Sequence, residues 1–130
     1  MCFNKVILHQ FHSVCAILLG MKDGTIQDSQ ITASSELGEK YPAVNARLDR
    51  PRIDGKVAWV SATNDLNQWI QVEFTTHTYV SGILLQGRAE SVGLMWVTRY
   101  TVEYSSDGET WQVVQNGEGV HDMVSTKLSK

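Results

Sequence analysis

Short segments in which apolar and polar residues alternate recur along this chain, and they constrain its fold more than any other feature. Residues 69–74 and 97–104 show this pattern most clearly. The residues that share the more apolar face are Ile70, Val72 and Phe74 in the first segment and Tyr100, Val102 and Tyr104 in the second. A period of two predicts β-strands with one buried face, because successive side chains of a strand point to opposite sides.

Other segments extend the pattern of short strands. Residues 25–35 are rich in β-branched and small polar side chains, and residues 79–86 form a near-continuous apolar run that predicts a strand buried on both sides. Asp107-Gly108 precedes a returning strand at 111–114 and is typical of a hairpin, since glycine accepts the positive φ that such turns need. With no helical periodicity of useful length, the chain is predicted to be an all-β sandwich or barrel.

Two segments are predicted to be loops. Residues 36–58 contain two prolines, two glycines and many charged residues, and residues 87–96 join two predicted strands. Long loops in a compact domain usually carry its function. We therefore place the candidate binding residues in these two segments.

Composition narrows the function classes. The 130 residues fit one domain, and a formal net charge of −3 argues against a nucleic-acid binder, which usually has a strongly basic surface. No stretch is apolar and long enough for a transmembrane helix. The two cysteines, Cys2 and Cys15, and the four scattered histidines have no metal-site spacing. Nucleophile-elbow and phosphate-loop motifs are also missing, so we expect no enzyme and no catalytic residues.

The ends of the chain and one turn leave alternatives open. Residues 1–14 are apolar but interrupted by polar residues, which indicates an atypical leader or a weak signal-like segment. The turn at 64–67 offers oxygens to calcium, but one carboxylate makes a weak site and a plain turn is favoured. We expect no other cofactor.

In order and spacing, a set of short segments resembles the discoidin domain, also called the coagulation factor V/VIII type C domain. The matching pieces are residues 19–21, 24–26, 30–35, 46–48, 58–59, 68–72, 86–88, 96–97, 100 and 104–111. The resemblance implies a jelly-roll β-sandwich, of the galactose-binding-domain-like kind, occupying residues 15–118. It also implies that Trp59, Trp69 and Trp111 pack in the core. Met95 and Trp96 are expected to anchor their loop to the core.

The chain departs from the family pattern at its end. Cys15 occupies the position of a family cysteine that pairs with one at the end of the domain, but no second cysteine follows it here. The final strands are also missing from the pattern, and residues 119–130 are expected to be a non-family tail. A sandwich without its last strands would expose an edge.

The resemblance implies binding through loops, or spikes, at one end of the sandwich. The predicted ligand-binding residues are Leu37, Lys40 and Tyr41 in the first spike, Arg50 and Arg52 in the second, and Arg88, Val92 and Leu94 in the third. Packing of Tyr41 on the sandwich, an ordinary solvated loop for the second spike and a salt-bridge role for Arg88 remain alternatives.

The predicted function is that of a non-catalytic, extracellular or cell-surface adhesion module. The expected partner is a cell-surface glycan or an anionic phospholipid membrane. The alternatives are a module that binds an extracellular protein, such as a receptor or matrix protein, and an inactive truncated fragment.

Overall fold

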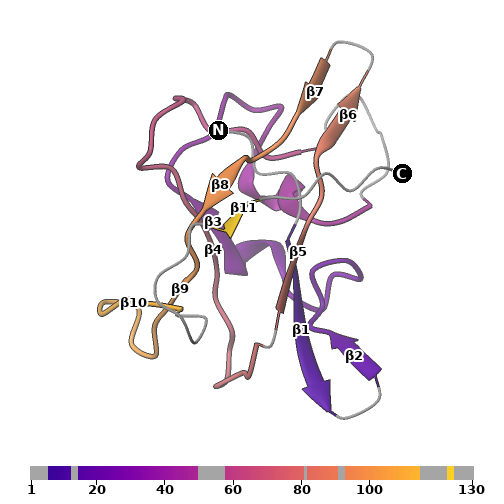
Figure 1. Ribbon diagram of the computed structural model, residues 1–130, viewed down its shortest axis with the longest axis vertical. Helices are drawn as coiled ribbons and strands as arrows, with labels where there is room; N and C mark the ends of the chain where they lie inside the picture. Colours follow the sequence, from indigo (N-terminus) through magenta and orange to yellow (C-terminus); the bar gives the residue numbers. More distant parts are fainter. Residues whose placement is uncertain are drawn as a thin grey trace.

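The computed structural model of this chain describes residues 6–12, 15–49, 58–80, 82–90, 93–114 and 123–124. Its elements are short antiparallel strands and two short 3-10 helices, η1 (Asp28–Gln30) and η2 (Ala43–Ala46), which confirms the all-β prediction (Figure 1). The largest sheet has the order β2 (Cys15–Leu18), β1 (Val6–His12), β5 (Gly82–Leu85). The remaining strands pair two by two: β3 (Ile31–Ala33) with β4 (Ile70–Val72), β6 (Arg88–Glu90) with β7 (Gly93–Met95), β8 (Arg99–Tyr100) with β11 (Met123–Val124), and β9 (Glu103–Tyr104) with β10 (Gln112–Val113).

The core gathers residues from distant parts of the sequence. Its buried members are Met21, Ile26, Ile31, Ala43, Ala46, Trp59 and Val97. The side chains predicted to share one face of residues 69–74, those of Ile70, Val72 and Phe74, pack against this cluster. Pairing of β3 with β4 sets Ile31 opposite Val72, which brings two apolar residues to the same place. The alternation in the sequence therefore predicted the buried face of β4 correctly.

Two predicted strands are shorter or less buried than expected. Only the last part of residues 25–35 is a strand, because η1 occupies residues 28–30. In β5, Ile83 and Leu85 pack against the core while Leu84 is exposed. The prediction that residues 79–86 are buried on both sides is wrong, since the core covers one side of this strand.

The tryptophans divide into buried and exposed ones. Trp59 is fully buried, as predicted, but Trp69 and Trp111 keep 49% and 42% of their surfaces exposed, and their predicted core packing is wrong. Trp69 falls on the opposite side of its segment from Ile70, which packs on the core. Trp111 belongs to the β9–β10 hairpin, which projects from the rest of the structure in Figure 1.

A buried arginine fastens the loop before η1. The Arg47 guanidinium donates to the carbonyl oxygens of Met21 (3.0 Å) and Ile26 (2.6 Å) and pairs with Asp28 Oδ1 at 2.6 Å. A buried cation needs such partners, because an uncompensated charge in the interior is costly. Arg47 therefore has a structural role.

The hairpin predicted at Asp107-Gly108 is confirmed. Gly108 has a φ of 77°, in the region that favours glycine. The Asp107 Oδ1 atom accepts hydrogen bonds from the backbone N–H groups of Thr110 (2.7 Å) and Glu109 (2.8 Å) and from Ser105 Oγ (2.8 Å). These hydrogen bonds, above all the one from the Thr110 N–H, hold the pKa of Asp107 well below its usual range.

The beginning of the chain contributes to the largest sheet. Residues 6–12 of the expected leader form β1, which pairs with β2 on one side and β5 on the other. Cys2 lies outside the described residues, and Cys15 begins β2. Within the described part of the chain, no helix has the length and apolar character needed to cross a membrane.

Candidate ligand-binding end

Three segments that are far apart in sequence meet at one end of the molecule. Figure 1 shows the loop that follows β3, the segment leading to β4 and the β6–β7 hairpin in the upper half of the view. We call this region the loop end, and its described members are Leu37, Lys40, Tyr41, Leu66, Arg88, Met95 and Trp96. Hydrogen bonds and one ring contact, described below, join the three segments.

The first predicted spike is a tight loop closed by its own polar groups. Glu36 Oε1 accepts a hydrogen bond from the N–H of Ala43 at 2.6 Å, which ties the two ends of the loop together. Gly38 turns the chain with a φ of 64°, and its carbonyl accepts the N–H of Tyr41 at 3.3 Å. Leu37 is 49% exposed on this closed loop. The loop therefore presents an apolar side chain to solvent on a backbone that is already ordered.

The segment around Trp59 holds the first spike through hydrogen bonds. The N–H of Leu37 donates to the carbonyl of Val60 at 2.8 Å, and the N–H of Val60 donates to the carbonyl of Tyr41 at 3.4 Å. The indole N–H of Trp59 donates to the carbonyl of Ser35 at 2.9 Å. Because Trp59 is fully buried, the spike is fastened directly to the core.

A cation–π contact joins the first and third predicted spikes. The guanidinium carbon of Arg88 lies 5.1 Å from the ring centroid of half-buried Tyr41, within the range of this interaction. Arg88 Nη1 also donates to Met95 Sδ at 3.6 Å across the β6–β7 pair. These contacts give Arg88 a structural role between two loops, and they join the half-buried ring of Tyr41 to the β6–β7 hairpin.

The third predicted spike is a β-hairpin, and the prediction that residues 87–96 form a strandless loop is wrong. β6 and β7 pair antiparallel, with Arg88 opposite Met95. The expected anchoring of Met95 and Trp96 in the core is also wrong, because both side chains are exposed. Within the described residues this ribbon pairs with no other strand, so no sheet partner extends over its edges.

Several predicted binding residues are not placed by the structure. Arg50 and Arg52 of the second spike and Val92 of the third lie outside the described residues, and Leu94 is described only as a member of β7. At the start of the second spike, Asp49 forms an ion pair with Lys22 at 2.8 Å. The structure thus brings together Leu37, Lys40, Tyr41 and Arg88 of the predicted set.

Sequence reasoning missed Leu66. Its side chain is 89% exposed, more than any other large apolar side chain described. The preceding Asp65 accepts hydrogen bonds from Gln68, Thr63 and the N–H of Asn67, and these lower its pKa. Both carboxylate oxygens of Asp65 therefore accept hydrogen bonds within the turn. The sign in the sequence that could have identified Leu66 was an apolar leucine among residues typical of turns.

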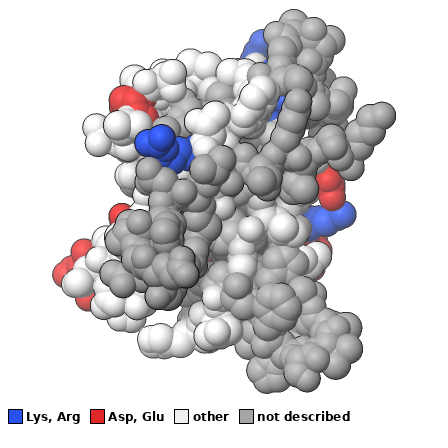
Figure 2. All heavy atoms as spheres, viewed as in Figure 1, with Lys and Arg blue, Asp and Glu red and all other residues white. Residues whose placement is uncertain are grey.

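The loop end carries charges of both signs, since Glu36, Glu39 and Lys40 are all exposed on the first spike. Figure 2 shows one face of the molecule, on which the described Lys and Arg side chains lie apart from one another and some lie beside acidic side chains. Within the described residues no group of three or more Cys, His, Asp and Glu side chains is arranged to hold a metal ion. The first spike therefore offers a ligand one exposed leucine, Leu37, with Glu36, Glu39 and Lys40 beside it, and the third spike offers exposed Met95 and the adjoining Trp96.

Ordered loops at one end of an all-β domain are an arrangement that binding modules use. The family model of the F5/8 type C domain matches residues 30–129, and the chain belongs to this family and has its jelly-roll β-sandwich fold. The match includes residues 119–129 of the predicted non-family tail. The exact limits of the domain within the chain stay a prediction.

The similar curated proteins are much longer than this chain. EGF-like repeat and discoidin I-like domain-containing protein 3 of Homo sapiens is 42% identical over 119 residues, which cover 86% of this chain and 24% of that protein. Lactadherin of Rattus norvegicus is 38% identical over 109 residues, covering 78% and 25%. Coagulation factor V of Pseudonaja textilis is 31% identical over 99 residues, covering 75% and 7%. The chain spans about a quarter or less of the relatives it matches.

Proposed function

We propose that this chain is an extracellular adhesion domain that binds an anionic phospholipid membrane through the loop end. The observation that carries the proposal is that loops joined at one end by hydrogen bonds and a cation–π contact each present exposed apolar side chains. Leu37 comes from the first spike, Met95 ends β7 and Trp96 follows it. Lys40 is an exposed cation next to the exposed Glu39.

The chemistry of these side chains favours a membrane over a glycan. Leucine and methionine side chains offer hydrophobic contact rather than hydrogen bonds. The hydroxyl groups of a sugar, in contrast, need many polar partners. An exposed tryptophan suits the membrane interface, because its ring is apolar and its N–H is polar. Lys40 adds attraction to an anionic headgroup, worth about 1 kcal/mol near such a surface.

Several weak contacts must act together for such binding to be stable. Each apolar side chain contributes about 1.5–3 kcal/mol if it is fully buried. The ordered backbone of residues 36–43 reduces the entropy that binding would cost, because the loop is closed before it meets a ligand. The Arg88–Tyr41 contact joins the first spike to the hairpin. Simultaneous contact by both loops is thereby supported.

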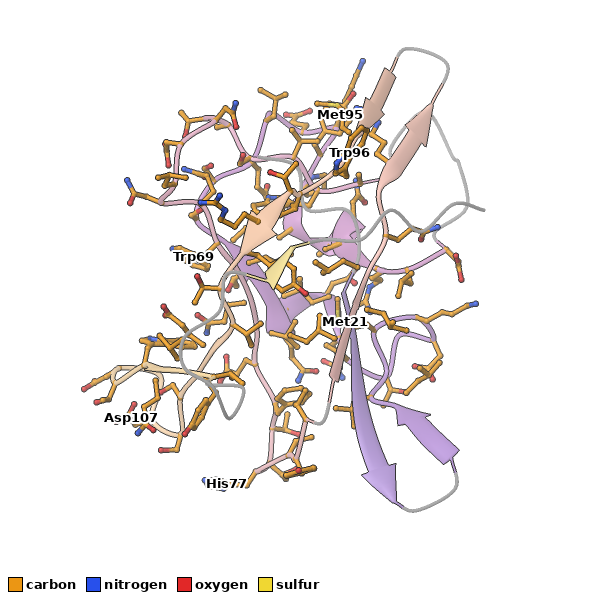
Figure 3. The ribbon with its side chains drawn as sticks, in the orientation of Figure 1. Met21, Trp69, His77, Met95, Trp96 and Asp107 are labelled. Atoms are coloured by element: carbon orange, nitrogen blue, oxygen red, sulfur yellow. The ribbon has the colours of Figure 1, made fainter. Side chains whose placement is uncertain are left out.

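Vesicle sedimentation tests the proposal. We expect the chain to sediment with vesicles that contain phosphatidylserine and to stay in solution with phosphatidylcholine alone. Leu37→Asp combined with Lys40→Glu should reduce this binding strongly. The matched control is Tyr79→Asp, since Tyr79 is 68% exposed and its segment, which includes His77, lies at the opposite end in Figure 3.

Other outcomes would redirect or end the proposal. Wild-type binding that persists unchanged after Leu37→Asp with Lys40→Glu, and after Val92→Asp with Leu94→Asp, would remove the loop end as the membrane site. Binding on a glycan array without any binding to vesicles would establish the glycan alternative instead. Binding to neither, with capture of an extracellular protein, would favour the protein-interaction alternative.

A further inference from the structure

The turn at residues 63–68 carries the most exposed large apolar side chain of the described structure. Leu66 is 89% exposed, compared with 49% for Leu37 of the first spike. Turn positions favour small polar residues, which stabilise the turn and hydrate well. A single exposed leucine is common on protein surfaces and means little alone. Its significance here comes from how the turn is built and where it is attached.

The turn is ordered by its own hydrogen bonds. Asp65 Oδ2 accepts from Thr63 Oγ1 at 2.7 Å, and Asp65 Oδ1 accepts from the N–H of Asn67 at 2.8 Å and from Gln68 Nε2 at 2.9 Å. Ser61 Oγ also donates to the carbonyl of Thr63 at 2.7 Å. Leu66 therefore sits on a fixed backbone, and little backbone freedom would be lost when its side chain meets a surface.

The same turn is fastened to the base of the first spike. Ser34 Oγ and Ser35 Oγ both donate to Gln68 Oε1, the first at 2.9 Å. The N–H of Ala62 donates to Ser35 Oγ at 3.0 Å. Ser35 directly precedes the loop of the first spike and its carbonyl accepts the buried Trp59 indole N–H. Figure 1 shows the segment before β4 at the same end as the loop after β3.

We propose that residues 63–68 form a fourth contact loop and that Leu66 enters the same membrane surface as Leu37. This inference rests on the proposed function. An isobutyl side chain has no polar group with which to bind a sugar, so the occupant that suits it is the hydrocarbon side of a membrane interface. The hydrogen bonds of Asp65 hold the polar part of the turn together, which leaves Leu66 as the part that contacts the ligand.

Vesicle binding by Leu66 variants tests the inference. Leu66→Asn should weaken binding to phosphatidylserine vesicles by about tenfold to a hundredfold, as expected for one buried leucine side chain. Leu66→Met should bind like the unchanged chain because it keeps the apolar surface. Both variants should unfold at the same temperature as the unchanged chain, since so exposed a side chain makes few contacts. Tyr79→Asn is the matched control and should leave binding unchanged.

The outcomes separate this inference from the proposed function. If Leu66→Asn binds as tightly as the unchanged chain while Leu37→Asp binds weakly, the fourth contact loop is wrong and the membrane function stands. If neither the unchanged chain nor any variant binds the vesicles, both are wrong. If Tyr79→Asn weakens binding as much as Leu66→Asn, the effect is not specific to the turn and the inference is also overturned.

Discussion

The turns at residues 63–68 and 105–110 use the same chemistry on two different supports. Each is organised by one exposed aspartate, Asp65 or Asp107, whose carboxylate accepts three hydrogen bonds and has a lowered pKa. The first turn is fastened through Gln68 to the base of the first spike. The second caps β9 and β10, which among the described residues pair only with each other.

The comparison shows that hydrogen bonds within a turn determine its conformation. The elements to which the turn is attached determine what it can contact. The supported turn carries the exposed Leu66, and its segment lies at the same end as the loop after β3 in Figure 1. The unsupported turn carries Gly108 and Glu109 at the end of a projecting hairpin. A rigid apolar tip beside other tips can add to a shared contact surface, whereas a polar tip on an isolated ribbon has no such partner. Disrupting each support in turn tests this difference.

The largest expected effect comes from replacing Trp59, which fastens the first spike to the core, and Trp111 of the projecting hairpin is its counterpart. Trp59→Ala should destabilise the fold by about 3–5 kcal/mol, because it leaves a large cavity in the core. It also removes the indole N–H that binds the Ser35 carbonyl. Trp111→Ala should cost about 1–2 kcal/mol, since 42% of that side chain is already exposed. Urea unfolding followed by fluorescence measures both changes. Equal losses would contradict the idea that only one turn is fastened to the core.

Loss of a single polar support should have an intermediate effect. Gln68→Ala removes the acceptor of Ser34 and Ser35 and a donor to Asp65. The expected destabilisation is about 1–3 kcal/mol, because partly buried hydroxyl groups lose their partner. Ser105→Ala is the control in the other turn, where it removes the oxygen that accepts the N–H of Gly108 at 2.9 Å.

The two support variants should also differ in membrane binding. Gln68→Ala is expected to weaken sedimentation with phosphatidylserine vesicles, because Leu66 would no longer be held in place. Ser105→Ala should leave sedimentation unchanged even though it loosens its own turn. A binding loss that is the same for both variants would show that general destabilisation, rather than the placement of Leu66, controls binding.

Much of the fold followed from patterns of two kinds. Alternation identified the core-facing side of β4, and Asp107-Gly108 identified the β9–β10 hairpin, because both signals depend only on neighbouring residues. The exposed positions of Trp69 and Trp111 were not predicted. A large aromatic residue in a strand pattern indicates burial, but burial depends on which other elements cover that face, and sequence periodicity carries no such information.

For the same reason, only part of the loop end was predicted from the sequence. Leu37 and Lys40 lie where loop composition placed them, and both are exposed. The contact between Arg88 and Tyr41 joins residues 47 positions apart, and no local pattern relates them. Leu66 was overlooked because its neighbours read as an ordinary polar turn, and only the three-dimensional structure shows how fully its side chain faces solvent. Long-range placement, rather than residue type, is what the sequence pattern left undetermined.

The smallest expected effect is a difference between the two turns in acid. A carboxylate whose folded pKa is lowered contributes stability above its unfolded pKa, about 3.9 for aspartate, and loses it as the pH falls through the folded value. Both turns should therefore be intact at neutral pH and loosen only below about pH 4. Asp107 accepts two backbone N–H groups and Asp65 accepts one, so the 105–110 turn should persist to lower pH. NMR titration of the Thr110 and Asn67 amide protons, with Asp107→Asn and Asp65→Asn as controls, measures the two transitions. If the turn at Thr110 loosens at a higher pH than the turn at Asn67, then attachment to the first spike, and not the number of backbone donors, decides how each turn resists acid.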